Sequence, residues 1–105
     1  MVYLKTVSLL FFLVATLTSA TTPQIHNTTG LAYFYQGKYA QAFEEFLSAA
    51  RKDPNNVIAH FNLGRIFERQ GNYKDAFVQY QRTLSLDPSH DQARIGYQKL
   101  IRFRE

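Results

Sequence analysis

Few residues of this chain have types and spacings that could carry chemistry. His26 and His60 stand 34 residues apart, and histidine is the commonest metal ligand, so a metal site is the first hypothesis. A zinc site needs three or four convergent ligands, and no carboxylate or third histidine lies at ligand spacing from this pair. The sequence contains no cysteine, which removes thiolate and disulfide chemistry. We therefore expect packing roles for both histidines, and no metal.

Catalytic patterns are also missing from the sequence. There is no Gly-rich phosphate loop, no nucleophile–base pair and no pair of acids at catalytic spacing, so we expect neither an enzyme nor a cofactor. Asn27-Thr28-Thr29 fits the N-glycosylation acceptor pattern, but this pattern is common by chance. Glu44 and Glu45 are expected on a solvated helix face. The chain is predicted to bind a partner rather than to convert a substrate.

The charge balance excludes one class of partner. The chain has 12 Lys and Arg against 8 Asp and Glu, a formal net charge of +4. The positive residues are dispersed along the sequence, whereas a nucleic-acid binder usually shows a clustered basic stripe with a stacking motif. We therefore expect no nucleic-acid partner.

Two 34-residue segments, 23–56 and 57–90, repeat one another. The identical pairs are His26/His60, Gly30/Gly64, Gln36/Gln70, Gly37/Gly71, Tyr39/Tyr73, Ala42/Ala76, Phe43/Phe77, Asp53/Asp87 and Pro54/Pro88. Glycines at 37 and 71 divide each segment, and the Asp-Pro pairs end each one, because proline cannot continue a helix. The punctuation predicts an all-α chain with five helices, at about 23–36, 39–52, 57–70, 73–86 and 90–103.

The period and its skeleton resemble the tetratricopeptide repeat. The skeleton reads His26-x2-Thr29-Gly30-x2-Tyr33…Ala42-x3-Phe46…Pro54 and His60-x2-Leu63-Gly64-x2-Phe67…Ala76-x3-Tyr80…Pro88. The resemblance implies an α-solenoid of helix–turn–helix units: a linker at 21–22, repeats at 23–56 and 57–90, and a capping helix at 91–105. Packing between helices is assigned to Gly30, Tyr33, Ala42, Phe46, Pro54, Gly64, Phe67, Ala76, Tyr80 and Pro88.

The final segment departs from the repeat pattern, as terminal units of an array commonly do. Its apolar residues are expected to cover the open side of the second unit; they are Ile95, Tyr97, Leu100, Ile101 and Phe103. Ser89 or Asp91 is expected to cap this helix. Two repeats fall short of the roughly three needed for stability, so the chain should be marginal or should self-associate.

The resemblance also implies where a partner binds, because family members use the concave face made by the first helix of each unit. The lining positions carried over by register are Asn27, Leu31, Phe34, Tyr35, Phe61, Asn62, Arg65, Arg69 and Lys99, with Gln24, Ile58, Ile95 and Arg102 around them. Such a groove is apolar at one end and cationic at the other. We expect its ligand to combine an aromatic or aliphatic anchor with one or two acidic groups.

One well-known variant of the family does not fit this chain. Chaperone-binding members carry a clamp of Lys and Asn residues, with one Arg, for a partner's C-terminal carboxylate. At the five clamp positions this chain has Asn27, Leu31, Asn62, Gln92 and Gly96, and only Asn62 matches. We therefore do not expect a chaperone adaptor.

The N-terminal segment 1–20 has the pattern of a secretory signal peptide. Lys5 precedes an apolar run at 7–17, and small residues follow it, which predicts cleavage between Ala20 and Thr21. The alternative is a retained membrane anchor, although the apolar run is shorter than the roughly 20 residues that span a bilayer. Cleavage would make contact with the membrane transient. The protein is predicted to be exported, to a periplasm or to the exterior.

Two function hypotheses follow from these observations. The first is an exported interaction module that binds a peptide or protein segment on its concave face. The second is a structural assembly subunit that self-associates through its repeat ends, as a homo-oligomer within an envelope complex.

Overall fold

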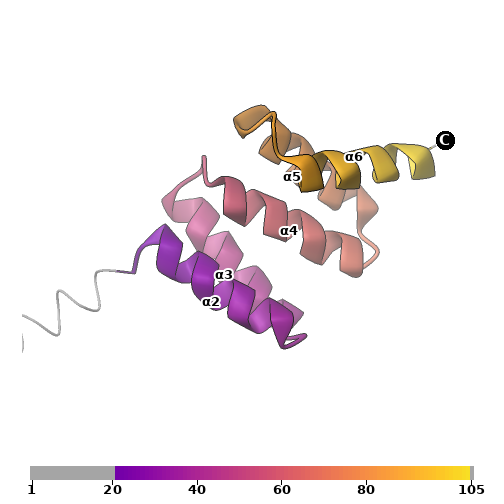
Figure 1. Cartoon of the computed structure of the whole chain (residues 1–105). Helices are drawn as coiled ribbons and strands as arrows, with labels where there is room; N and C mark the ends of the chain where they lie inside the picture. Colours follow the sequence, from indigo (N-terminus) through magenta and orange to yellow (C-terminus); the bar gives the residue numbers. More distant parts are fainter. Residues whose placement is uncertain (1–20, 105) are drawn as a thin grey trace, which may run out of the picture.

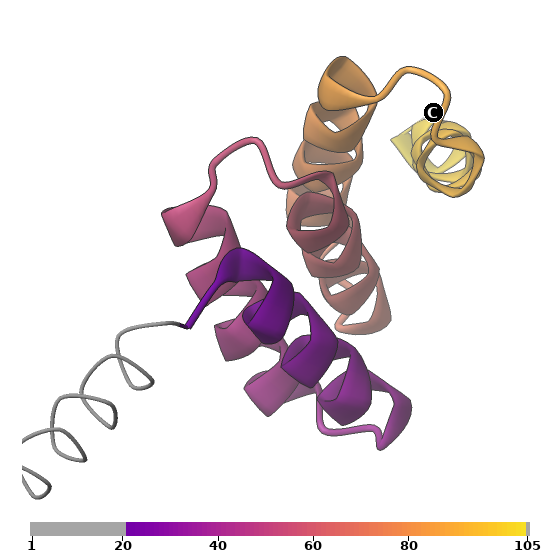
Figure 2. The ribbon, with the colours of Figure 1, turned by 60° about the vertical axis from the view of Figure 1, so that its left-hand side comes forward.

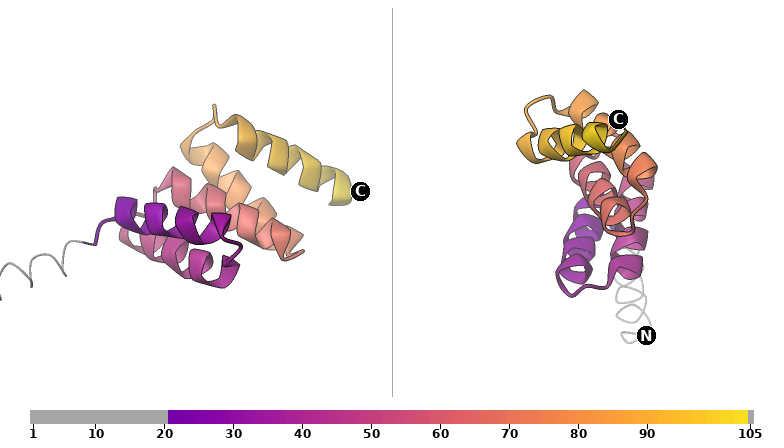
Figure 3. Two further views of the ribbon diagram at one scale, coloured as in Figure 1. Left: turned by 60° about the horizontal axis from the view of Figure 1, so that its bottom comes forward. Right: turned by 90° about the vertical axis from the view of Figure 1, so that its right-hand side faces the viewer.

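The computed structural model describes residues 21–104, and the predicted signal segment, including Ala20, lies outside the described residues. The described part contains five α-helices: α2 (Pro23–Tyr35), α3 (Tyr39–Lys52), α4 (Val57–Arg69), α5 (Tyr73–Leu86) and α6 (Asp91–Arg104) (Figure 1). Figures 2 and 3 show the stacking order: the pair α2–α3 lies at one end, α4–α5 in the middle and α6 at the other end. The predicted all-α class, the five helices and the helical-repeat arrangement are confirmed.

The helix ends follow from local capping. The side-chain oxygens of Thr22, Asn56 and Asn72 accept hydrogen bonds from backbone N–H groups in the first turns of α2, α4 and α5. Gly37 and Gly71 both adopt φ of 75°, a left-handed conformation that favours glycine, and so each ends the first helix of its unit. Every predicted helix boundary lies within one residue of the observed one.

The cap of α6 corrects one expectation. Neither Ser89 nor Asp91 caps this helix; the Nδ1 atom of His90 accepts the backbone N–H of Ala93 at 3.1 Å. An imidazole acceptor here requires the proton to lie on Nε2. His90 also packs its ring against Phe61, with centroids 4.5 Å apart. One side chain therefore both starts α6 and joins it to α4.

The helices approach one another closely at glycines, which have no side chain. A Cβ atom at Gly30 would lie 2.8 Å from the Phe46 ring, and one at Gly64 would lie 2.7 Å from the Tyr80 ring. A Cβ atom at Gly96 would also lie 2.7 Å from Tyr80, on the opposite edge of the ring. Only glycine allows helices to approach an aromatic ring this closely. The period of 34 does not predict Gly96, because the register position is Gln98.

The remaining predicted packing residues occupy several environments. Ala42, Phe46, Ala76 and Tyr80 are buried in the two hydrophobic clusters of the stack. Tyr33 and Phe67 are half-buried against the same clusters, and Phe67 contacts both. The two prolines, Pro54 and Pro88, are exposed in the turns that follow α3 and α5.

The capping helix covers the second unit with fewer residues than expected. Leu100 and Ala93 are buried, and Tyr97 stacks on Phe77 with ring centroids 4.7 Å apart. Ile95 and Phe103, in contrast, are 65% and 68% exposed, so they do not cover the core. They lie on the open surface of α6, where a partner could contact them.

No helix within residues 21–104 is both long enough and apolar enough to cross a membrane.

The close helix crossings predict the effect of one substitution. Ala76 is completely buried beside Tyr80, so Ala76→Leu should overpack the crossing and lower the free energy of unfolding by about 1–3 kcal/mol. Ala32→Leu is the matched control because Ala32 is exposed on α2. Circular dichroism melts should show a lower midpoint for the first variant alone. Equal midpoints would mean that position 76 tolerates a larger side chain.

Candidate functional site

Contacts between helices bring α2, α4 and α6 together on one face of the stack. The guanidinium of Arg65 on α4 lies over the Phe34 ring of α2, and Lys99 of α6 reaches Glu68 of α4. A hollow of about 330 Å³ crosses this face; its lining residues are Tyr35, Phe61, Arg65, Glu68, Tyr80, Gln92, Ile95, Gly96 and Lys99. We call this surface the first-helix face.

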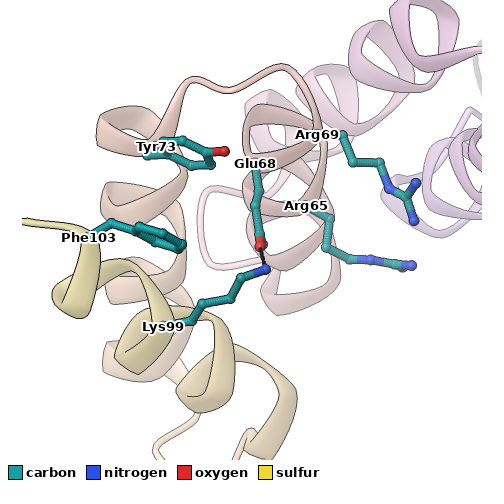
Figure 4. Close-up of a pocket in the computed structure, with 6 residues that line it drawn as sticks. All are labelled: Arg65, Glu68, Arg69, Tyr73, Lys99 and Phe103. Carbon is teal, nitrogen blue, oxygen red and sulfur yellow. Dashed lines mark hydrogen bonds and ion pairs between the residues drawn. The ribbon is translucent and has the colours of Figure 1, made fainter.

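A second hollow, of about 480 Å³, adjoins the first and is drawn in Figure 4. Its lining residues are Arg65, Glu68, Arg69, Tyr73, Lys99 and Phe103. The rings of Tyr73 and Phe103 stack 5.8 Å apart and form its wall on the α5–α6 side. The two hollows share Arg65, Glu68 and Lys99, so they form one continuous, mostly cationic surface.

The two arginines of α4 are held by aromatic rings. The Cζ atom of Arg65 lies 4.1 Å from the Phe34 centroid and 5.6 Å from the Phe61 centroid. The Cζ atom of Arg69 lies 5.1 Å from the same Phe34 centroid and 5.4 Å from that of Tyr39. Cation–π attraction therefore positions both guanidinium groups beside one ring. Phe34, predicted as groove lining, is buried beneath them.

Glu68 changes the expected charge pattern of this surface. The sequence predicted a groove with a cationic end and with Arg65, Arg69 and Lys99 in its lining, but Glu68 lies among these residues and pairs with Lys99 at 2.6 Å. Its other carboxylate oxygen accepts the Tyr80 hydroxyl at 2.7 Å. Glu68 lies three residues after Arg65 on the same helix, and that spacing was the available signal for it.

The ionisation of this cluster follows from its contacts. Burial raises the pKa of Glu68, but hydrogen bonds from Lys99 and Tyr80, together with the nearby positive charges, lower it by more. The pKa of Glu68 therefore lies below its usual value. Burial, followed by the hydrogen bond to Glu68, raises the pKa of Tyr80. The hydrogen bond to Glu68 raises the pKa of Lys99. Glu68 is therefore a carboxylate, Tyr80 a neutral donor and Lys99 a cation near neutral pH.

Two predicted groove residues are occupied by contacts within the protein. Asn27 is buried and donates to the Asn56 side chain at 2.9 Å, which leaves the Oδ1 atom of Asn27 without a partner. Asn62 is also buried; it donates to the Ile58 carbonyl at 2.8 Å and accepts from Arg65 at 3.1 Å. Neither amide is an open lining residue. The burial of Asn27 also hides the glycosylation acceptor in the folded chain.

The other predicted groove residues lie nearer to solvent. Tyr35 is 75% exposed beside the first hollow, whereas Phe61 and Leu31 are half-buried. At the clamp positions, Gln92 lines this hollow and Gly96 lies against Tyr80, where no side chain fits. Binding roles for these residues remain predictions.

The histidines form equivalent contacts in the two units. The Nδ1 atom of His26 lies 2.7 Å from Glu45, and that of His60 lies 2.9 Å from Gln79, in each case nineteen residues further on. Glu45 is therefore the partner of His26 and not part of a purely solvated face. The described residues include no cluster of three or more His, Cys, Asp or Glu side chains that could hold a metal ion.

The lowered pKa of Glu68 predicts a pH-dependent stability. The Glu68 carboxyl group binds its proton more tightly in the unfolded chain than in the folded one. Its contribution to the free energy of unfolding is therefore present above the unfolded-state pKa of about 4.3 and is lost as the pH falls through the lower folded-state pKa. Glu68→Gln should lower the free energy of unfolding by about 1 kcal/mol near neutral pH and by less in acid. Denaturant titrations of both proteins across the acid range measure the difference.

The comparison of the two proteins isolates Glu68. Asp87, whose pKa is also lowered, through its hydrogen bond with Ser89, is present in both. A difference in stability that stays constant with pH would contradict the assigned ionisation of Glu68.

Comparisons with known proteins bear on the fold and the family. None of the curated proteins compared matches the sequence significantly. Among solved structures, the second TPR of Spaghetti (RPAP3), bound to the HSP90 peptide SRMEEVD, is similar with a TM-score of 0.75 and 20% identity, over 82% of this chain and 80% of that chain. The Arabidopsis OM64 TPR domain is similar with a TM-score of 0.75 and 22% identity, over 78% of this chain and 68% of that chain. The MamA protein is similar with a TM-score of 0.73 and 20% identity, over 76% of this chain and 44% of that chain.

The family follows from the sequence match and agrees with these folds. The tetratricopeptide repeat profile matches residues 27–95, which include most of both units and the first part of α6. This match covers more than half of the chain. The chain therefore belongs to the tetratricopeptide repeat family of non-catalytic protein-interaction modules.

Proposed function

We propose that the protein is an exported interaction module whose first-helix face binds a partner segment carrying acidic and apolar side chains. One observation carries this proposal: a continuous hollow surface crosses α2, α4 and α6, with Arg65, Arg69 and Lys99 beside it. Among the described residues that line it, Glu68 is the only acid, and both of its oxygens are already hydrogen-bonded. The surface therefore has an excess of positive charge.

Exposed apolar side chains beside these cations favour a mixed ligand. Tyr35 and Ile95 border the first hollow from α2 and α6 and are 75% and 65% exposed. Aromatic and arginine side chains are over-represented among residues that dominate interface energies. A bound segment could place an apolar side chain between Tyr35 and Ile95 while its acidic groups face Arg65 and Arg69.

The similar structure of the second TPR of Spaghetti contains a peptide, SRMEEVD, with three acidic residues. Its sequence identity of 20% supports only the shared fold. This chain lacks four of the five clamp residues, so we propose a different acidic partner and a different set of contacts.

Charge reversal on the first-helix face tests the proposal. We expect Arg65→Glu with Arg69→Glu to abolish capture of the partner by the tagged protein from an extract of the source cells, because acidic groups would meet like charge. Circular dichroism should remain helical, since Arg69 is exposed, Arg65 is half-buried and neither belongs to the two hydrophobic clusters. Capture by the unmodified protein should also weaken between about 0.05 M and about 0.5 M NaCl, where screening shortens the Debye length.

Arg51→Glu with Arg82→Glu is the matched control. Both side chains are exposed on the second helices α3 and α5, and the change in net charge is the same. If the partner is still captured after charge reversal of Arg65 and Arg69, at both salt concentrations, the interaction lies elsewhere on the protein. The molar mass of the purified protein, measured by light scattering, tests the alternative of self-association: a stable oligomer would favour the assembly role.

Export rests on the signal-peptide pattern of residues 1–20. We expect the exported protein to begin at Thr21, and N-terminal sequencing of protein recovered outside the cytoplasm would decide this. Recovery of Met1–Lys5 on protein in the membrane fraction would instead indicate a retained anchor.

A further inference from the structure

Two like charges are held together on α4 by a single aromatic ring. Arg65 and Arg69 lie one helical turn apart, and both guanidinium groups contact the ring of Phe34, at 4.1 and 5.1 Å. Figure 4 shows both groups pointing to the same side, away from the Glu68–Lys99 pair. Like charges at this spacing repel one another. The arrangement therefore leaves positive charge concentrated at one point of the surface.

Each guanidinium is also oriented by a hydrogen bond. An Nη1 atom of Arg65 donates to the Asn62 side chain at 3.1 Å, and that of Arg69 donates to the Tyr39 hydroxyl at 3.0 Å. Both acceptors are neutral, and each uses one nitrogen of a group that carries five N–H donors. The ring contacts and the hydrogen bond restrict each guanidinium and leave most of its N–H donors for a ligand.

Neither arginine has an anionic partner within the described residues. The ion pairs of residues 21–104 join His26 with Glu45, Arg94 with Asp91, and Lys99 with Glu68. Glu68 is the nearby acid, but one of its oxygens is bound by Lys99 and the other by Tyr80. The protein therefore orients two guanidinium groups and, within the described residues, pairs neither with an anion at ion-pair distance.

We propose that Arg65 and Arg69 form a seat for two adjacent carboxylates of the bound segment, one for each guanidinium. This proposal rests on the proposed function and specifies its ligand. A planar guanidinium matches a carboxylate through two parallel hydrogen bonds, a geometry that a lysine cannot provide. Two monoanions neutralise two cations and can each face one guanidinium, whereas a dianionic phosphate carries both of its charges on one group.

The seat differs from a clamp shared among three helices, because both arginines project from α4. Adjacent carboxylates have two sources in a protein segment. They are two neighbouring acidic side chains, or a C-terminal acidic residue that offers its side chain and its terminal carboxylate together. This chain lacks four of the five residues of the clamp that holds a C-terminal carboxylate, so we assign the seat to two neighbouring acidic side chains. Five small probes separate the two sources.

The probes are N-acetylglutamylglutamate methylamide, N-acetylglutamate, N-acetylglutamate methylamide, N-acetylglutamine and N-acetylglutamine methylamide. In this order they present two neighbouring side-chain carboxylates, one side-chain and one terminal carboxylate, a side-chain carboxylate only, a terminal carboxylate only, and none. The measurement is NMR titration of the full-length, ¹⁵N-labelled protein, followed at the arginine Nε–Hε signals. Arg65→Lys and Arg69→Lys assign the two signals and serve as charge-matched variants.

We expect N-acetylglutamylglutamate methylamide to shift the Arg65 and Arg69 signals in a saturable manner and to bind about tenfold more tightly than either single carboxylate. Tighter binding of N-acetylglutamate would overturn the assignment to side chains and indicate a chain end. The neutral probe should shift neither signal. Arg65→Lys with Arg69→Lys should weaken binding of the tighter dicarboxylate about tenfold or more, although the net charge is unchanged.

Three results would overturn the seat. Equal shifts at Arg51, Arg82 and Arg102 would indicate ordinary counter-ion binding. Unchanged affinity in the double lysine variant would remove the role of guanidinium geometry. Tighter saturation of the same signals by inorganic phosphate would replace carboxylate as the ligand. These results leave the capture experiment intact, because capture can be lost on charge reversal whether or not this seat exists.

Discussion

The ring of Tyr80 is the contact on which the rest of the first-helix face depends. It lies between two glycines of different helices, and a Cβ atom at either Gly64 or Gly96 would approach it to 2.7 Å. The ring therefore sets how closely α4 and α6 approach α5. Its hydroxyl then holds the carboxylate of Glu68, which in turn binds Lys99. A packing constraint in the core thus fixes the charged groups at the surface, because the same side chain belongs to both.

The two units use the same frame with different chemistry at the junction between them. In the first unit Asn27 donates to Asn56, whose oxygen also caps α4. At the equivalent positions of the second unit, Phe61 packs against His90, whose nitrogen caps α6. In each case one side chain both starts the first helix of a unit and contacts the first helix of the preceding unit. A hydrogen bond can therefore be exchanged for a ring contact without changing the stacking, provided that the capping acceptor is kept.

The period of 34 predicts the structural features that both units share and misses those that occur once. It predicts the five helices, the turn glycines and the close approach at Gly30 and Gly64, because each depends on local conformation or on a contact present in both units. It misses Gly96, because this glycine meets the far edge of the Tyr80 ring from the next helix and stands at the register position of Asn62, not of Gly64. It also misses the pairs of Glu45 with His26 and Glu68 with Lys99, which depend on distances across helices. The burial of Asn27 and Phe34 depends on their neighbours in the same way, so a lining position inferred from register alone is not necessarily an open one.

The distribution of charge at the far end of the stack bears on the choice between self-association and a foreign partner. Tyr73, Val78 and Phe103 are exposed there and line a hollow of about 430 Å³ between α5 and α6. Val78 and Phe103 take the places of Glu44 and Arg69 of the preceding unit, so apolar side chains replace charged ones where an array meets solvent. Such a surface favours association, but Lys74 lines it, and Lys99 and Arg102 lie beside Phe103. Pairing two copies through this surface would bring these cations together, whereas a partner with acidic side chains would neutralise them. The same excess of positive charge at the first-helix face and at the array end therefore favours an acidic partner over a second copy of the chain.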